Sequence, residues 1–493
     1  PPPPPPPPPP PALPRQSGAG QVPDYQSAQY DFSVGEPFGP QLRYSYERLL
    51  VDTAFARVVV AYDGKEHRSV AVKVIRAINR YQRAAAVETA LMALVTRADG
   101  TARSGCLPLL DAITVGSHAA LVLPLATCSL YDLLRGNRYA PFDGTFTRQV
   151  GLQVLRSLSF LHDLTLIHGD VKPENILLML DEPMDVLPPG TPPPHPPVKP
   201  CALDDAEVVR VVASHPRRVP RVPRVLLADF GNCILSSSPH PGLIATRMYR
   251  PPEVLLRLPY GPPIDAWAAA CVMVECYTGD ALLRGHGVVE HLALIERVLN
   301  QPIPASLRTA ACTKSPAVAS FFTEGGHVQW PPTAEAVAAA GDQGPPTAHA
   351  VARLAATRRL TDMIIHPPDA PLLATLTSLL HPLAAARASP RSALATATFA
   401  GVAASLGLPL SPPRPAGGAW SDERALAELA AVERALEREK ETAVRGGGGG
   451  TLSGDEEEDE QAKGEGEEVD VGGVDNTALY DDDGDDDDDD DDD

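Results

Sequence analysis

The chain has few of the features that mark a secreted, membrane or metal-binding protein. Its seven cysteines are scattered, with no CxxC pair and no metal-ligand spacing. This pattern is typical of reduced thiols in a cytosolic or nuclear protein. No apolar stretch reaches the roughly 18 residues of a membrane helix, because acidic residues interrupt even the most apolar region, 264–283. We therefore expect no membrane span, and no signal peptide is visible.

Both ends of the chain lack the large apolar side chains that a core needs. Residues 1–11 are all proline, a run that favours extended polyproline helix. Residues 455–493 hold 23 acidic residues and the single basic residue Lys463, whereas the whole chain has a net charge of −21. The remainder is thus close to neutral, and we expect disordered tails. The acidic tail is a solubilising extension, a segment that attracts a basic partner by its charge, or a mimic of a polyanion.

Between the tails, strand patterns come first and helix patterns later. Alternating apolar residues predict strands over 48–52, 57–63, 68–75 and 118–126, and periodic ones predict helices over 80–96, 131–137 and 147–164. This order indicates an α+β protein with a small sheet-rich lobe and a larger helical lobe. We expect a disordered proline-rich segment at 1–41, the two lobes at 42–125 and 126–402, a linker with a charged helix at 403–453, and the disordered acidic tail at 454–493.

Residues 181–224 interrupt the large lobe with PPGTPPPHPP and RRVPRVPR. Too few large apolar side chains fall there to bury anything, so we expect an insertion that loops out. Its arginines form either a docking or localisation patch or ordinary solvated surface. Farther on, residues 421–445 predict one charged helix with Ser421 as its N-cap. This helix docks on the folded body of the chain or on a partner, or it stays solvated.

The segment IHGDVKPENILL carries three polar residues at a spacing that suits phosphoryl transfer. Asp170 can accept a hydrogen bond from a substrate hydroxyl, Lys172 can neutralise the moving phosphate, and Asn175 can hold a magnesium ion. A polar loop that merely precedes a strand would not require these residues at these offsets. We therefore predict Asp170 and Lys172 as catalytic residues.

Other motifs supply the remaining parts of such a site. In VAVK, Lys73 ends a strand where it can reach phosphates, and Glu88 in the next helix can hold that ammonium in place. In LLADFGN, Asp229 can chelate magnesium, and Gly231 lets the backbone turn. Asn175 and Asp229 are thus the predicted metal ligands.

Three further residues are expected to support the site. Thr246, in ATRMYRPPEV, can hydrogen-bond Asp170 and Lys172. Glu253 can pair with a later arginine, most plausibly Arg387. Asp265 is an acid within an apolar helix and would be costly without partners, so we expect it to bond the backbone of the catalytic loop.

Together these motifs resemble a eukaryotic protein kinase over about residues 42–402. The segments RYSYERLL and VAVKVIRAINRYQRAAAVE resemble the small lobe of the CDC-like, or LAMMER, kinases. VVEHLALIERVL, at 288–299, resembles the EHLAMMER signature of that group, and Arg250 in TRMYRPPEVLL resembles the characteristic arginine of the wider CMGC group. The insertion also falls where LAMMER kinases carry one.

The resemblance implies a function that the residues alone do not. It implies a bilobal kinase fold that binds ATP and Mg²⁺ and phosphorylates Ser or Thr of arginine-serine-rich splicing factors, with Tyr autophosphorylation as well. It implies basic protein substrates, a location in the nucleus or cytoplasm, and neither direct nucleic-acid binding nor membrane association. In the nucleotide site it implies Val51, Val58, Ala71 and Leu177 as further contacts.

Two parts of the family pattern are altered. The glycine positions of the phosphate-covering loop GxGxxGxV are occupied by Val51, Thr53 and Ala56, although Phe55 and Val58 are retained. We expect the hairpin to form but to hold ATP loosely or at a changed angle. 

The adenine-binding hinge is also altered. In ALVLPLA, Leu123 takes the gatekeeper position and Pro124 follows it. Proline still offers a carbonyl, and the amide near Ala126 remains available, so this change alone need not abolish nucleotide binding.

The residue before Asp170 is Gly169, where many kinases have an arginine that reads a phosphorylated activation loop. We therefore predict that activation-loop phosphorylation is not required, although phosphorylation at 236–238 is compatible with the sequence. An active kinase is favoured because the catalytic residues are retained. The alternatives are a pseudokinase or scaffold with weakened nucleotide binding and, more remotely, a chaperone with a kinase-like body.

Overall fold

The structure is a computed structural model that describes residues 29–100, 103–193, 195–196, 198–237, 242–342, 344–412 and 414–415, together with residues 423 and 427. The proline run and the acidic tail lie outside these residues. So does the predicted charged helix at 421–445, apart from the two single residues.

The chain divides into two compact units. The small unit holds the described residues up to 82 and residues 113–120, and the large unit holds 83–112 and everything from 121 onward. Most of helix α2, Asn79–Ala98, thus falls in the large unit. The expected lobe boundary at residue 125 therefore stays a prediction.

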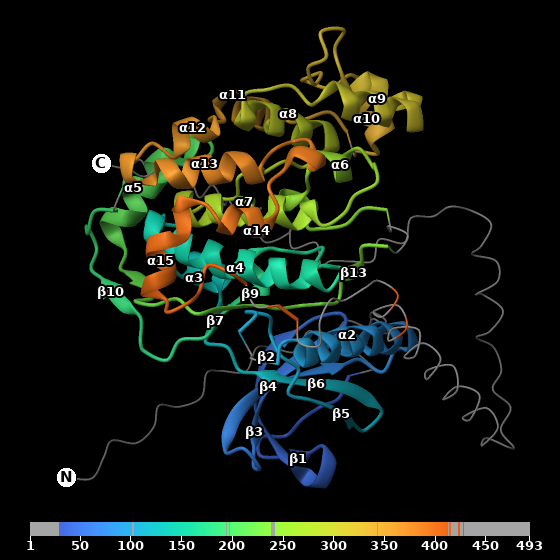
Figure 1. Cartoon of the computed structure of the whole chain (residues 1–493), viewed down its shortest axis with the longest axis vertical. Coiled ribbons are helices and arrows are strands. Elements are labelled where there is room, and N and C mark those ends of the chain that lie inside the picture. The colour runs from blue at the N-terminus through green and yellow to red at the C-terminus, as the bar shows by residue number, and fades with distance from the viewer. Residues whose placement is uncertain are drawn as a thin grey trace, which may run out of the picture. The chain divides into compact units, whose positions relative to one another are not determined.

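Most of the small unit belongs to a six-stranded sheet with strand order β1-β2-β3-β4-β6-β5 (Figure 1). Val59, Val60 and Ala61 are consecutive on the central strand β3 and all buried, so both faces of that strand are covered. The predicted strands are confirmed. The bounds are β1 Pro37–Phe38, β2 Tyr44–Asp52, β3 Ala56–Asp63, β4 Arg68–Ile75, β5 Asp111–Val115 and β6 His118–Pro124, with η1 at Pro40–Leu42.

The ordered chain begins earlier than we expected. Residues 29–41 fell within the segment predicted to be disordered, but they include β1, which pairs with β2. Phe32 stacks on Tyr46 with ring centroids 5.0 Å apart, and it meets Phe38 edge-on at 5.1 Å. Because such contacts join residues distant in sequence, the local pattern before residue 42 does not reveal them.

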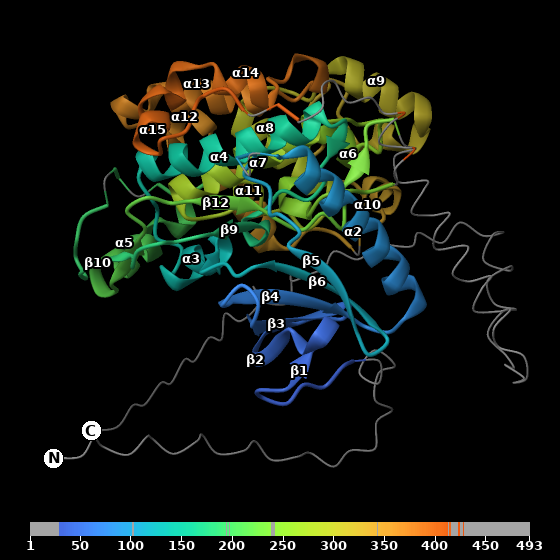
Figure 2. The same cartoon turned by 60° about the horizontal axis from the view of Figure 1, so that its bottom comes forward.

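The large unit is helical and centres on α4, Gly144–Asp163, and α7, Pro263–Thr278, which pack against each other. Every residue from Ile264 to Thr278 is buried, so α7 is the central helix of this unit. Around these two helices, α14 (Pro390–Leu394) and α15 (Ala400–Ser405) contact α4, and α13 (Ala370–Leu379) contacts α7 (Figure 2). 

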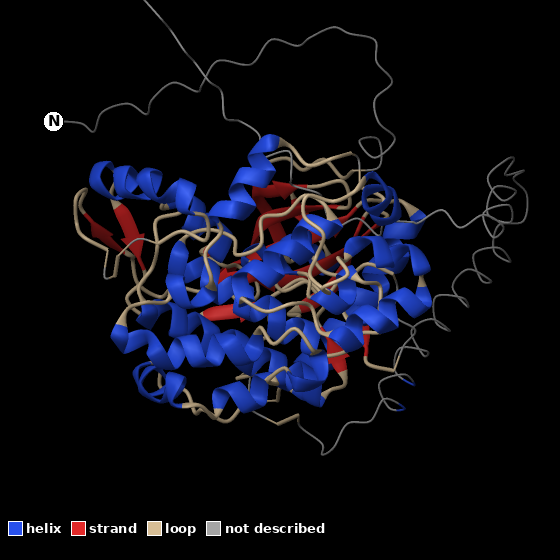
Figure 3. Cartoon of the chain, turned by 90° about the horizontal axis from the view of Figure 1, so that it is seen from above, coloured by secondary structure: helices blue, strands red, loops and turns tan. Residues whose placement is uncertain are grey.

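The remaining elements of the large unit are short (Figure 3). The helices are α3 Leu130–Gly136, α5 Asp205–Ser214, α6 Pro252–Leu255, α8 Val288–Leu299, α9 Ala305–Lys314, α10 Ala334–Ala340, α11 Ala348–Ala356, α12 Leu360–Met363, α13 Ala370–Leu379, α14 Pro390–Leu394 and α15 Ala400–Ser405. The 3₁₀ turns are η2 Pro173–Asn175, η3 Ala202–Asp204, η4 Arg247–Tyr249, η5 Pro316–Phe321, η6 Pro367–Asp369, η7 Ala384–Ala386 and η8 Ala397–Phe399. The strands are β7 Cys128–Ser129, β8 Leu166–Ile167, β9 Ile176–Leu178, β10 Asp185–Leu187, β11 Arg217–Val219, β12 Val225–Leu227 and β13 Ile234–Leu235.

The expectation that residues 181–224 bury nothing is wrong. Strands β10 and β11 pair there, and helix α5 places Val208, Val211 and Val212 in a buried cluster with Ala140. Three valines are enough because they cover apolar surface that the helical body already presents, so the insertion needs no core of its own.

Polar contacts anchor the same insertion to the large unit. Lys199 Nζ donates to the carbonyl oxygens of Tyr139 and Gly279, both at 2.8 Å. The Arg358 guanidinium bonds both carboxylate oxygens of Asp205, at 2.8 and 2.6 Å. The insertion is therefore a folded part of the large unit. None of the described helices is long and apolar enough to cross a membrane.

Candidate active site

Asp265 of α7 anchors the backbone of the segment that carries the predicted catalytic residues. This carboxylate is 1% exposed and accepts hydrogen bonds from the backbone amides of His168 and Gly169, both at 2.9 Å. Burial alone would raise the pKa of Asp265, but the hydrogen bond from His162 and the neighbouring donors lower it below its usual value. The predicted role of Asp265 is confirmed.

His168 joins this segment to the loop that carries Asp229. Its Nε2 lies 3.0 Å from the carbonyl oxygen of Ala228, and its Nδ1 lies 3.2 Å from the amide of Asp170. Because a carbonyl only accepts and an amide only donates, this pairing makes Nε2 the donor and Nδ1 the acceptor. No motif points to His168, since an isolated histidine carries no spacing signal.

Asp170 is the centre of a compact hydrogen-bond network. Its Oδ1 accepts from the amide and the hydroxyl of Thr246, at 3.1 and 2.7 Å. Its Oδ2 lies 2.9 Å from Lys172 Nζ and 3.2 Å from Asn175 Nδ2. Lys172 also donates to the Thr246 hydroxyl at 3.1 Å, so the predicted contacts of Thr246 are confirmed.

The environment of Lys172 keeps it charged. Burial lowers the pKa of this amine, but the adjacent Asp170 carboxylate outweighs burial and raises it above the ordinary value. The Lys172 ammonium therefore lies beside the Asp170 carboxylate, which would accept a hydrogen bond from a substrate hydroxyl.

The two predicted metal ligands come from neighbouring segments. Asn175 uses its Nδ2 to donate to Asp170, which leaves its Oδ1 as the atom able to coordinate a cation. The amide of Ala228 donates to the carbonyl of Asn175 at 2.8 Å, which places Asp229 directly after this contact. One amide and one carboxylate oxygen suit Mg²⁺, which keeps water and takes phosphate oxygens as its other ligands. No group of three or more His, Cys, Asp or Glu that could hold a metal occurs among the described residues.

Asp229 has an unusual backbone conformation. Its φ of 64° lies in the left-handed region that non-glycine residues rarely adopt. The amide of Gly231 lies 3.4 Å from Asp229 Oδ1. Such a conformation costs about 1–3 kcal/mol and persists where the surroundings impose it, as at functional sites.

The predicted nucleotide contacts of the small unit lie on adjacent strands. Val58 on β3 is the register partner of Val51 on β2 and of Lys73 on β4. Ala71 is two residues from Lys73 and therefore lies on the same face of β4. These four residues are thus brought together by the hairpin pairing.

The other predicted nucleotide residues belong to the large unit. Glu88 is buried in α2, and Leu177 is half-buried on β9, where it pairs with Ser129 and Leu226. Leu123 and Pro124 end β6 and are half-buried, and Ala126 follows them. Their roles as nucleotide contacts stay predictions.

Glu253 and Arg387 form the expected ion pair. The two bonds measure 2.7 and 3.0 Å, and the side chains are 2% and 0% exposed. This fully buried pair ties α6 to the segment after α13.

The VVEHLALIERVL segment forms α8, and its charged residues hold nearby loops. Glu296 accepts from the amides of Ile303 and Val328, at 2.8 and 3.0 Å. Arg297 Nε donates to the carbonyl of Thr357 at 2.8 Å. The signature therefore acts structurally in this chain.

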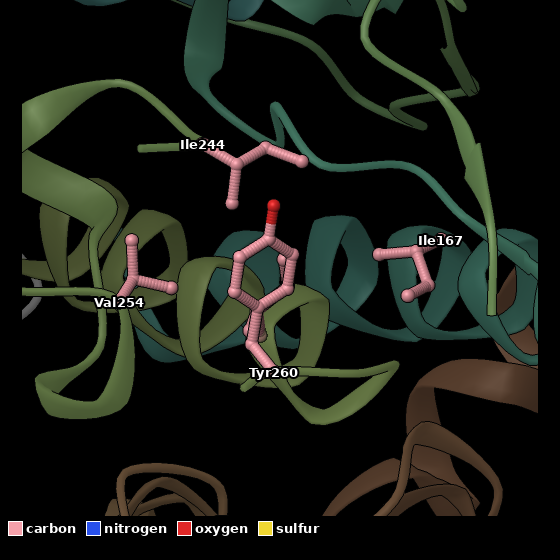
Figure 4. Close-up of a cluster of buried hydrophobic side chains, with 5 residues drawn as sticks. Ile167, Ile244, Val254 and Tyr260 are labelled. Atoms are coloured by element: carbon pink, nitrogen blue, oxygen red, sulfur yellow. The ribbon is translucent and has the colours of Figure 1, made fainter. Parts of the chain in front are cut away.

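Gly169 packs against Asn232 and Ile244, at the two ends of the predicted activation loop. A Cβ at this residue would lie 2.7 Å from Ile244 Cδ1 and 2.8 Å from the carbonyl oxygen of Asn232. Ile244 belongs to a buried cluster with Ile167, Val254, Tyr260 and Ile264, in which the Tyr260 ring points toward Ile244 (Figure 4). Any side chain at residue 169 would therefore begin in contact with the Ile244 side chain and the Asn232 carbonyl.

Comparison with family models identifies the family of the chain. The model described as "Protein kinase domain" matches residues 44–394, so the chain belongs to the protein kinase family. Within that family its relatives include kinases named as serine/threonine-protein kinases and kinases named as dual specificity protein kinases, and the resemblance to LAMMER kinases seen in the sequence is confirmed.

Three relatives illustrate this relationship. The chain is 34% identical to serine/threonine-protein kinase AFC1 of Arabidopsis thaliana over 65% of its own length and 64% of the relative. It is 33% identical to dual specificity protein kinase KNS1 of Saccharomyces cerevisiae over 57% of this chain and 37% of the relative. It is 31% identical to dual specificity protein kinase CLK4 of Mus musculus over 55% and 52%. The match thus spans less than two thirds of each relative's own length.

A solved structure confirms the fold. The crystal structure of the PF14_0431 kinase domain superposes with a TM-score of 0.62 over 76% of this chain and 99% of that chain, at 24% sequence identity. 

Proposed function

We propose that this protein transfers the γ-phosphate of ATP to Ser or Thr hydroxyls of protein substrates. The observation that carries the proposal is the Asp170 network, in which one carboxylate is held by Thr246, Lys172 and Asn175. Such an arrangement fixes the orientation of a base and a cation within a few ångströms of each other, which is most of what phosphoryl transfer asks of a protein.

Each residue of the network has a distinct role in the proposed reaction. Asp170 orients the substrate hydroxyl and takes its proton as the oxygen bonds to the γ-phosphorus. The bond from that phosphorus to the β-phosphate oxygen breaks, and ADP leaves. Lys172 balances the negative charge on the transferred group. Mg²⁺, held by Asn175 and Asp229, would neutralise charge on the phosphates.

We further propose basic, arginine-serine-rich proteins as substrates and the nucleus or cytoplasm as the place of action. The resemblance to LAMMER kinases supports the first point, and the names of relatives that are called dual specificity kinases support activity on Tyr as well. Kinship is the weaker kind of support, because related folds often act on different substrates.

The direct test is phosphate transfer from labelled ATP with Mg²⁺ to an arginine-serine-rich peptide. We expect the wild type to be active, and Asp170→Asn and Asp229→Asn each to lose at least about a hundredfold in kcat, the size of effect typical for a general base or an electrostatic group. Asp362→Asn is the matched control, because this exposed aspartate lies on α12, outside the network, and should retain activity.

Failure would have a clear form. If the wild type transfers no phosphate and shows no thermal shift with ATP and Mg²⁺, the protein is a pseudokinase, and its binding partners become the question.

A further inference from the structure

The turn between β2 and β3, residues 52–56, is closed by its own side chains. The hydroxyl oxygen of Thr53 accepts from the amides of Phe55 and Ala56, at 3.3 and 3.1 Å. The same hydroxyl donates to the carbonyl of Ala56 at 2.9 Å, and the Thr53 amide reaches that carbonyl at 3.0 Å. This turn occupies the place of the family's glycine loop.

A buried arginine supports the turn from β4. Arg76 is 3% exposed, and its guanidinium donates to the carbonyl of Thr53 and, at 2.6 Å, to Asp52. Its backbone amide donates to the carbonyl of Phe55 at 3.0 Å. Asp52, Thr53 and Phe55 of the turn are therefore all hydrogen-bonded to Arg76, which is itself held by burial.

A second arginine holds the same carboxylate from the other side. Arg57 Nε lies 3.0 Å from the second oxygen of Asp52, and Arg57 Nη1 lies 2.8 Å from Asp31 and 3.1 Å from the carbonyl of Tyr30. The ordered segment before β1 thus takes part in fixing the turn.

These contacts change what the turn offers to an anion. Loops that bind phosphates do so through backbone amides that point at the ligand without partners of their own. Here the amides of Phe55 and Ala56 already bond the Thr53 hydroxyl, so a phosphate oxygen would have to displace that hydroxyl. Such an exchange gains little, because one hydrogen bond is broken for each one made.

We propose that the Thr53 hydroxyl takes the place of a phosphate oxygen on the amides of Phe55 and Ala56. Thr53 thereby determines how much the phosphates contribute to the affinity for a nucleotide. Nucleotide binding then relies on Lys73 and the predicted metal ligands rather than on the amides of the turn. The inference rests on the proposed function, since it concerns the nucleotide used in that reaction.

The test compares the affinities of Mg-ADP and adenosine for the full chain by titration calorimetry. Thr53→Val keeps the branched shape but removes the hydroxyl, and Thr53→Gly restores the family residue. Both should raise the ratio of ADP to adenosine affinity about tenfold, the effect expected of hydrogen bonds to a charged group. Thr53→Ser keeps the hydroxyl and should leave the ratio near the wild-type value.

The outcomes separate this inference from the proposed function. A ratio that is unchanged or lower in both Thr53→Val and Thr53→Gly overturns it, as does a lack of ADP binding in every variant. A raised ratio in a protein that transfers no phosphate would uphold the role of Thr53 and refute kinase activity.

Discussion

Gly169 lies where the structure leaves no room for a side chain. Its φ is 78°, and a Cβ would meet both the Ile244 side chain and the Asn232 carbonyl. We expect Gly169→Ala to lower stability by about 2–4 kcal/mol, of which 1–2 come from the left-handed backbone and the rest from overpacking. Thermal unfolding would measure the loss of stability, and the NMR signals of the Ile244 methyl groups would report changes in its packing.

Gly190 provides the matched control for Gly169. It has a similar φ of 77°, but nothing lies within 4 Å of its Cβ position. Gly190→Ala should therefore show the backbone cost alone. Equal losses in the two variants would show that contact with the activation segment is not what excludes a side chain from residue 169.

Among single residues, the motifs predict the catalytic groups because the chemistry of phosphoryl transfer dictates both residue type and spacing. Asp170, Lys172 and Asn175 follow from such a rule, and the structure brings them within bonding distance. His168 and Thr53 do not, because their roles depend on which backbone groups the fold brings near them.

At the scale of elements, α7 carries a buried acid whose protonation affects stability. Burial raises the pKa of Glu275 to about 8, although the hydrogen bond from the Tyr249 hydroxyl at 2.8 Å opposes this. The folded state therefore keeps a proton that the unfolded state releases above pH 4.5, and stability should fall as pH rises from 4.5 to 8.

Glu275→Gln tests this dependence, because glutamine keeps the acceptor oxygen but does not titrate. We expect the variant to lose less stability than the wild type between pH 5 and 8, by an amount on the order of a few kcal/mol. Glu335→Gln, an exposed glutamate on α10, is the control. Parallel melting-temperature curves for the wild type and Glu275→Gln would contradict the assignment.

The insertion depends on one face of α5. Val211 is 8% exposed within the buried valine cluster, whereas Val209 on the same helix is 57% exposed. Val211→Asp would bury an unpaired charge, so we expect amide exchange over 205–214 to accelerate at least about tenfold. Val209→Asp should leave exchange nearly unchanged, and similar rates in the two variants would rule out docking through this face.

Strands and long helices followed directly from apolar periodicity, but the insertion did not. A segment with its own core needs many large apolar residues, whereas one that docks needs only a few. Composition therefore misled the prediction for 181–224. Composition also misled the prediction for the segment that holds Phe32, because the partners of that ring lie on β1 and β2.

At the scale of the whole molecule, the charge is concentrated in residues 455–493. We predict that this tail competes with acidic surface on the kinase for arginine-rich substrates. Removing residues 454–493 should lower the KM for a basic peptide at low salt, and the difference should vanish at high salt because exposed charges are screened. Unchanged KM values at both salt concentrations would refute the competition.

The sequence by itself determined the family and the fold, and it predicts which groups are catalytic. Phosphoryl transfer tolerates few alternatives to Asp170, Lys172, Asn175 and Asp229, and these residues stand in short local motifs. Tertiary structure alone decided how the other features are used: that Gly169 is required by Ile244, that the insertion is folded, and that Thr53 closes the 52–56 turn. Each of these depends on contacts between residues far apart in the chain or on backbone groups, and neither leaves a mark in a local pattern of side chains.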